Sequence, residues 1–366
     1  MSVERLLRTD FFAMDSTIEL QAFDGTLVED VTDRLVVDGS WIARDSTGLE
    51  AGTASFVFDG TEGFDFGRHQ LALTLTIHDL NGVEGSVAFR AGNWLMRPPG
   101  TVLDHTQLTT IECVDTVSIL SSIMGRSWRV DKGTNIGIAV ADLLQAHGLN
   151  GLSLRLPDIA LEMASAPSWA LTEKLTWLEV ANEILRASAH TGLFTDPNGT
   201  LTTLPWKPID EVEPTWRFDT STADSWISAS SQIEAETDPV PNVWLGVVTA
   251  PDSSVAYEKF QVENQDSLHP WSIPSQGGRR VVRVLEVDAP SIPALQATVQ
   301  QAAELDTLRA SRVRIECGPL PVIWASDVVT VHAPKLDIIE KRGVCREWRI
   351  PLDPANTDAY YLLDVG

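Results

Sequence analysis

Apolar and polar residues alternate along several short stretches of the first hundred residues. Thr17–Phe23 and Leu71–Ile77 show this period of two clearly, and Asp24-Gly25 follows the first of them as a turn. Alternation predicts strands with one buried face, and many short strands separated by glycine-containing turns are typical of a small barrel or sandwich. Arg97-Pro98-Pro99-Gly100 closes this block, and one further strand, Gln107–Val114, follows. We therefore expect an N-terminal block built of strands.

The middle of the chain changes to the 3.6-residue period of helices. Asp115–Met124 fits a short helix, and Thr134 is a suitable N-cap for a second helix that runs through Leu144. Thr176-Trp177-Leu178-Glu179 has the spacing of a capping box, in which the hydroxyl and the carboxylate each bind the other residue's backbone N–H. Asp196-Pro197-Asn198-Gly199 is a strong turn signal between two strands. We expect an αβ block with helices and a hairpin.

From about Trp206 the strand pattern returns. The clearest strands here are Trp226–Ser231, Asn242–Thr249, Arg280–Val287, Val313–Cys317, Asp327–His332 and Arg346–Leu352. We expect Arg346–Leu352 to be the last strand. Pro293 stands in the first turn of one long helix, at about 292–310, whose apolar residues keep helical spacing. The order of blocks is therefore β, then αβ, then β with one long helix.

The chain is strongly acidic. It has 51 acidic and 27 basic residues, which give a formal net charge of −24. Tight binding to a phosphate backbone needs clustered Lys and Arg, so this balance argues against specific nucleic-acid binding. The three cysteines, Cys113, Cys317 and Cys345, are far apart and form no CxxC pair. We expect no disulfide scaffold and synthesis in a reducing cytoplasm.

The first residues show no signal peptide, and no stretch approaches the roughly 18 apolar residues that span a bilayer. Motifs for catalysis are also missing from the sequence. No two histidines stand at i, i+4, and HExxH, GxSxG and GxxxxGK[ST] are absent. We therefore predict no catalytic, cofactor-binding or metal site.

Two weaker chemical readings remain open. Asp59, Glu62 and Asp65 lie in a glycine-rich loop that offers oxygen ligands for calcium, but the loop lacks the EF-hand pattern, so a solvated hairpin tip is favoured. Two acidic residues elsewhere could serve a glycoside hydrolase, although the sequence does not place them across a sugar. The twelve tryptophans are compatible with sugar stacking. Their even spread favours several small cores and interfaces.

A series of short motifs in the second half occurs in an order that resembles a known family. After the capping-box helix comes a D-x-x-G-x-L hairpin, then an N-V strand, a D…P-x-S-I…G-x-R segment and a P…D-V-V-x-V strand. The matching residues are Asp196, Gly199, Leu201, Asn242, Val243, Asp266, Pro270, Ser272, Ile273, Gly277, Arg279, Pro321, Asp327, Val328, Val329 and Val331. Over roughly residues 110–350 the chain is similar to baseplate-hub proteins of long-tailed bacteriophages, also called minor tail proteins in phages of actinobacteria.

The resemblance implies an α+β, multi-domain, phage tail hub-like fold with two small β-barrel domains linked by an α/β domain. On this basis we expect residues 1–110 to form an N-terminal β-barrel domain and residues 111–205 an α/β domain with helices and a hairpin. Residues 206–366 would form a C-terminal β-barrel domain that carries the long helix. Two barrels in each of three chains imply a homotrimeric ring of pseudo-six-fold symmetry.

The resemblance also implies a structural, non-enzymatic virion protein at the tail tip, made in the host cytoplasm. The ring would continue the tail tube and anchor tip and fibre proteins, and DNA would pass through its bore during attachment and ejection. The implied partners are the distal tail protein, the tape measure protein and tail fibre or tip proteins, with no membrane and no cofactor. Because the chain ends at Gly366, where larger relatives continue, we expect separate chains to digest the cell wall or bind the receptor.

The best candidate for an interface is the Trp- and Pro-rich stretch Pro239–Pro274, with Asn242, Trp244, Pro270 and Trp271 as the contact residues. A core role for these aromatic residues is equally compatible with the sequence. The alternative functions are a Trp-rich carbohydrate-binding protein and a cell-wall glycoside hydrolase of a phage tail.

Overall fold

The computed structural model describes most of the chain. The described residues are 12–45, 52–79, 85–99, 108–148, 154–221, 227, 232–235, 240–248, 259–309, 311–324, 326–353 and 359–365. Most of the expected strand Trp226–Ser231 lies outside the described residues. Within them the chain is mostly β, with few helices and several sheets, as the sequence pattern predicts.

The N-terminal block is a set of antiparallel strands. They are β1 (Phe12–Ala22), β2 (Leu27–Asp30), β3 (Leu35–Asp45), β4 (Gly52–Asp59), β5 (His69–Asp79), β6 (Ser86–Met96) and β7 (Leu108–Asp115). The alternation in β5 has the predicted effect, because Leu71, Leu73, Leu75 and Ile77 are all fully buried. A 3₁₀ turn, η1 (Thr32–Arg34), links β2 and β3.

The C-terminal strands continue the same sheet. They are β13 (Trp216–Asp219), β14 (Gln232–Ala235), β18 (Ser311–Cys317), β19 (Val328–Ala333), β20 (Ile338–Pro351) and β21 (Ala359–Val365), with η5 (Pro334–Leu336) before β20. Strand β20 pairs with β3, so the two β blocks form one 13-stranded sheet over one continuous hydrophobic core. The described strands do not close into a barrel, and the two-barrel architecture is not confirmed.

The last strand is not the one expected from the sequence. The prediction that the strand at Arg346–Leu352 ends the β structure is wrong, since β21 follows it and pairs with both β18 and β20. Tyr361, Leu363 and Val365 of β21 are fully buried, and so is most of the side chain of Asp364. Tyr360 and Leu362, on the other face, are only partly buried, but they are aromatic and apolar too, so the sequence lacks the simple alternation that marks a half-buried strand.

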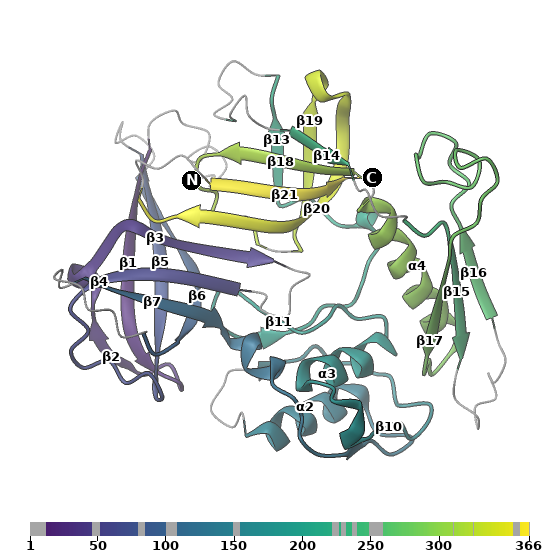
Figure 1. The fold of residues 1–366 in the computed structure, drawn as a ribbon, viewed down its shortest axis with the longest axis horizontal. Helices are drawn as coiled ribbons and strands as arrows, with labels where there is room; N and C mark the ends of the chain where they lie inside the picture. Colours follow the sequence, from purple (N-terminus) through teal and green to yellow (C-terminus); the bar gives the residue numbers. More distant parts are fainter. Residues whose placement is uncertain are drawn as a thin grey trace.

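The αβ block lies below the sheet in Figure 1. It contains η2 (Thr116–Ser121), β8 (Trp128–Arg129), α2 (Ile136–His147), β9 (Leu154–Arg155), β10 (Ser168–Trp169), η3 (Leu171–Glu173), α3 (Trp177–Arg186), β11 (Phe194–Thr195), β12 (Leu201–Thr202) and η4 (Ile209–Glu211). The capping box of Thr176 and Glu179 is present as predicted. The N-cap of α2 is Asn135, one residue after the predicted Thr134, and the expected helix at Asp115–Met124 is the 3₁₀ turn η2.

A third unit is a small sheet covered by the long helix. The sheet contains β15 (Val243–Val248), β16 (Lys259–Glu263) and β17 (Val282–Val287), and α4 (Ile292–Leu308) packs on the face toward the rest of the molecule (Figure 1). A Cβ atom at Gly246 would lie 2.3 Å from Val299 Cγ2, so the close approach of α4 to β15 requires glycine there. In the part of the chain that the structure describes, no helix is both long and apolar enough to cross a membrane.

A buried ion pair stands where the two β blocks and the αβ block meet. Arg44 of β3 and Asp115 at the end of β7 are joined at 2.9 Å, with side chains 2% and 0% exposed. The guanidinium carbon lies 4.1 Å from the ring centre of Trp324 and 5.4 Å from that of Trp94. Asp115 also caps η2 through Ser118. Burial raises the pKa of Asp115, and the Arg44 charge and the Ser118 donors oppose that rise.

The hairpin of the αβ block docks on the same place. Trp324 Nε1 donates to the Thr195 carbonyl at 3.0 Å, and Gly92 N donates to the Pro197 carbonyl at 3.0 Å. The predicted turn closes with a 2.9 Å bond from Gly199 N to the Asp196 carbonyl, and a Cβ at Gly199 would lie 2.5 Å from Asn93. The ion pair and the hairpin together hold strands β3, β6 and β7 against the αβ block.

We predict that Arg44→Met lowers the free energy of unfolding by about 3–5 kcal/mol, because it leaves the Asp115 carboxylate buried without its partner. Urea unfolding followed by tryptophan fluorescence measures the change. Arg44→Met/Asp115→Asn should recover part of the loss, since the amide keeps the cap acceptor without the charge. The matched control is Arg68→Met, whose 3.8 Å pair with Asp65 is exposed and should contribute less than about 1 kcal/mol. Equal losses for Arg44→Met and Arg68→Met would contradict the structural role of the buried pair.

A second prediction concerns pH. Burial raises the pKa of Asp327 to about 6, although the Trp324 N–H and Thr215 oppose the rise. The folded chain therefore binds this proton more tightly than the unfolded chain, so the contribution of Asp327 to stability is present near pH 4 and falls as the pH rises to 6. Asp327→Asn should remove this pH dependence and raise the free energy of unfolding at pH 7 by about 2 kcal/mol. The full shift would give more, but the carboxyl group is partly open to solvent, which screens the effect. Parallel pH profiles of wild type and variant would refute the shift.

Candidate functional site

Two of the four predicted interface residues are buried inside the chain. Trp244 of β15 is 1% exposed, packs against α4, and donates from Nε1 to Asp306 Oδ2 at 2.8 Å. Arg283 of β17 binds the same carboxylate at 2.7 and 2.8 Å. Trp244 therefore joins the small sheet to its helix, which is the core role that the sequence left open.

Asn242 is also fully buried, and its amide organises the loop before β17. Its Nδ2 donates to the carbonyl oxygens of Trp271 and Arg279 at 3.1 and 3.0 Å, and its Oδ1 accepts from Val281 N at 2.8 Å. A single side chain thus satisfies three backbone groups of the segment 264–281, which has no regular secondary structure to satisfy them. We call this segment the 264–281 loop.

The 264–281 loop is fastened to α4 and presents apolar groups outward. His269 is 8% exposed, with Nε2 3.2 Å from the Thr307 carbonyl and Nδ1 3.1 Å from Asn264 Nδ2. Beside it, Leu268 is 91% exposed and Pro270 is also exposed, while Trp271 is half-buried. The interface prediction remains a prediction for Asn242, Trp244, Pro270 and Trp271, of which Pro270 and Trp271 reach the surface of the single chain. Leu268 was not among the predicted interface residues. Its position between turn residues in DSLHPW could have indicated its exposure, because no helix or strand is there to bury it.

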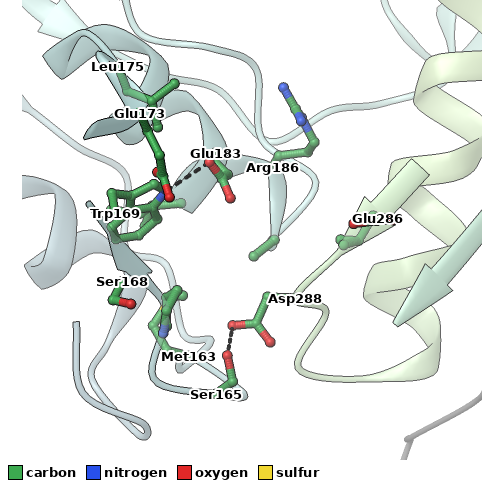
Figure 2. Close-up of a pocket in the computed structure, with 14 residues that line it drawn as sticks. Met163, Ser165, Ser168, Trp169, Glu173, Leu175, Glu183, Arg186, Glu286 and Asp288 are labelled. Carbon is green, nitrogen blue, oxygen red and sulfur yellow. Dashed lines mark hydrogen bonds between the residues drawn. The ribbon is translucent and has the colours of Figure 1, made fainter. Parts of the chain in front are cut away.

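A pocket of about 380 Å³ lies between the αβ block and the small sheet. Figure 2 shows Glu183 and Arg186 of α3 on one side and Glu286 and Asp288, at and after the end of β17, on the other. Trp169 Nε1 donates to Glu183 Oε2 at 2.8 Å, and Ser165 Oγ donates to Asp288 Oδ2 at 2.6 Å. These carboxylates therefore bind the chain's own donors, and the second bond links the two units across the pocket.

The pocket offers no evident nucleophile or metal site. Within the described residues there is no group of three or more His, Cys, Asp or Glu side chains placed to hold a metal ion. The cysteines Cys113, Cys317 and Cys345 are buried and unpaired, and burial raises the pKa of each thiol. In the turn between β4 and β5, Asp65 Oδ1 accepts from Gly67 N at 3.0 Å, which is the behaviour of a hairpin tip.

No protein-family model matches the sequence, and no curated protein matches it. Solved structures do match its fold. A tail protein from Neisseria meningitidis MC58 superposes with a TM-score of 0.63 at 12% identity, over 96% of each chain. The 43 kDa tail protein of prophage MuSo2 from Shewanella oneidensis gives 0.57 at 12% identity, over 96% of this chain and 98% of that one. Prophage tail protein gp18 from Listeria monocytogenes EGD-e gives 0.56 at 11% identity, over 95% and 94%.

The chain therefore has the fold of phage tail proteins. The similarity covers 95–96% of this chain and confirms the expected fold relationship. An origin in a phage of actinobacteria stays a prediction.

We predict that Asn242→Ala destabilises the protein by about 2–3 kcal/mol and opens the 264–281 loop, because buried backbone groups lose their partners. Limited proteolysis with mass spectrometry should find new cleavage between residues 264 and 281. Asn198→Ala, at an exposed turn, is the matched control and should leave the cleavage pattern unchanged. A loop as resistant in Asn242→Ala as in the wild type would show that the amide does not hold it.

Proposed function

We propose that this chain is a structural, non-enzymatic protein of a phage-type tail, and that it acts as the baseplate hub at the distal tip. The observation that carries the proposal is the fold, which is shared with three tail proteins over 94–98% of their lengths. In this role three copies form a ring that continues the tail tube, anchors tip and fibre proteins and lets DNA pass. The partners are the distal tail protein, the tape measure protein and the fibre or tip proteins.

The domain division belongs to the same proposal. Residues 1–110 and 206–366 supply the two β domains of each copy, and residues 111–205 form the α/β domain attached to them. The shared core of β1–β7 and β18–β21 favours a rigid pair of β domains, because their strands are paired through β3 and β20. Such a rigid pair suits a ring that must keep its geometry during host attachment and DNA ejection.

The acidic composition is compatible with a bore through which DNA moves. A net charge of −24 repels phosphate groups, so a bore lined by acidic side chains lets DNA slide without binding it.

Sugar binding has weaker support. The tryptophans Trp94, Trp169, Trp177, Trp216, Trp244, Trp324 and Trp348 are buried and cannot stack on a sugar. Trp41 and Trp128 are partly exposed, but arginine side chains lie over their rings, at 4.3 Å for Arg349 over Trp41 and 5.3 Å for Arg126 over Trp128. These nine tryptophans therefore serve cores and arginine stacks.

We predict that an antibody against this chain labels only the tail tip of virions, or of tail-like particles, from cells that carry the gene. Immunogold electron microscopy is the measurement, and particles from cells without the gene are the control. Gold confined to the tip is expected because a hub occupies the distal ring. Absence of label from both intact and gently disrupted particles would contradict the proposal. Label along the tube would assign the chain to another tail component.

A further inference from the structure

A row of arginine and aromatic side chains crosses the outer face of the sheet where its two halves join. The strands run in the order β18, β21, β20 and β3. They carry Arg314, Tyr360, Arg349 and Trp41, which we call the arginine–aromatic face. Their neighbours in sequence, Tyr361 and Trp348, point to the opposite side and are buried in the core.

Each arginine of this face lies on an aromatic ring. The guanidinium carbon of Arg314 is 4.0 Å from the ring centre of Tyr360, and that of Arg349 is 4.3 Å from the ring centre of Trp41. Tyr360 is held by a 2.5 Å bond from its hydroxyl to Glu347. Stacking fixes the planes of the guanidinium groups and leaves their N–H edges directed away from the rings.

A cavity of about 440 Å³ opens between these side chains. Arg314 is paired with Glu316 at 3.2 Å. Arg349 is exposed, and its guanidinium group makes neither a hydrogen bond nor an ion pair with the described residues. A guanidinium group in this state is ready to bind a carboxylate through two parallel N–H bonds. Trp, Tyr and Arg are also the residue types most enriched among interface hot spots.

The opposite end of the same sheet is an uncovered edge of complementary chemistry. Strand β2 forms one end of the strand order, and its residues Leu27 and Val28 are 56% and 48% exposed. Glu29 and Asp30 follow directly and are exposed too. An exposed apolar edge strand invites pairing with another chain, so a native protein usually covers or charges it. Glu29 Oε1 is already paired with Arg34, and Asp30 Oδ1 accepts from Thr32 N at 3.0 Å. The β2 edge thus offers apolar groups for Trp41 and Tyr360, and the second oxygen of each carboxylate for Arg349.

We propose that the arginine–aromatic face of one copy binds the β2 edge of a second copy. The inference rests on the proposed function and names the surfaces through which the ring assembles. The face lies on β18, β21, β20 and β3, and the edge is β2 at one end of the strand order, so the two are different surfaces of the chain. The contact is therefore head-to-tail, and repetition of such a contact closes a ring when the rotation between copies permits it.

The test uses one variant that damages each surface. Arg349→Glu places a carboxylate opposite the acidic edge, and Val28→Asp adds charge to the apolar edge. Each purified variant should be monomeric in sedimentation velocity, with a dissociation constant raised at least tenfold over the wild type, which should form a closed oligomer. Arg349→Lys keeps the charge but loses the planar fork, and should weaken assembly less than Arg349→Glu does. Arg68→Glu, at an exposed arginine outside both surfaces, should assemble like the wild type.

Mixing the two variants gives the decisive result. Arg349→Glu retains an intact β2 edge and Val28→Asp retains an intact face, so each mixed pair has one working contact. The mixture should contain dimers of the two variants and nothing larger. A mixture that stays monomeric, or an Arg349→Glu chain that still forms the wild-type oligomer, overturns the inference. A wild-type chain that is monomeric at all concentrations also overturns it, whereas tail-tip labelling by gold would then leave the hub proposal standing.

Discussion

The buried pair of Arg44 and Asp115 is the constraint on which the rest of the structure depends. It joins a strand of the sheet to the cap of the αβ block, and the rings of Trp94 and Trp324 enclose its cation. Removing two charges from water is expensive, and their attraction repays the cost only in good geometry. The local sequence accommodates the pair, since a Cβ at Gly52 would lie 2.9 Å from the Asp115 side chain. We infer that the pair specifies how the blocks meet more than it adds net stability.

This junction has a consequence for the sheet. Strand β3 carries Arg44 on its inner face and pairs with β20 through the same segment, with Arg44 opposite Trp348. A displacement of the ion pair would therefore shift the seam between two strands about three hundred residues apart. The outer side of that seam carries Trp41 and Arg349, so the buried charge and the exposed arginine are held by the same pair of strands.

The parts of the fold that could be predicted are those encoded locally. The capping box at Thr176, the turn at Asp196–Gly199 and the alternation in Leu71–Ile77 each depend on residues close in sequence, and each is present. The pairing of β3 with β20 depends on long-range contacts for which a single sequence holds no signal. The candidate interface shows the same limit, because Asn242 and Trp244 are residue types that serve equally well in a core and at an interface.

The electrostatics of the chain limit how copies can meet. With 51 acidic residues against 27 basic ones, two copies repel each other over most relative orientations. This repulsion is screened beyond about 10 Å at 0.1 M salt, but it persists between groups brought into contact. A contact between copies is therefore favoured where it places an exposed guanidinium group against carboxylates. Arg44 is buried in an ion pair with Asp115, and Arg283 is paired with Asp306. Arg349, in contrast, is exposed on a paired strand. Because the basic residues are outnumbered by acidic ones, the positions of the exposed cations help to determine assembly geometry.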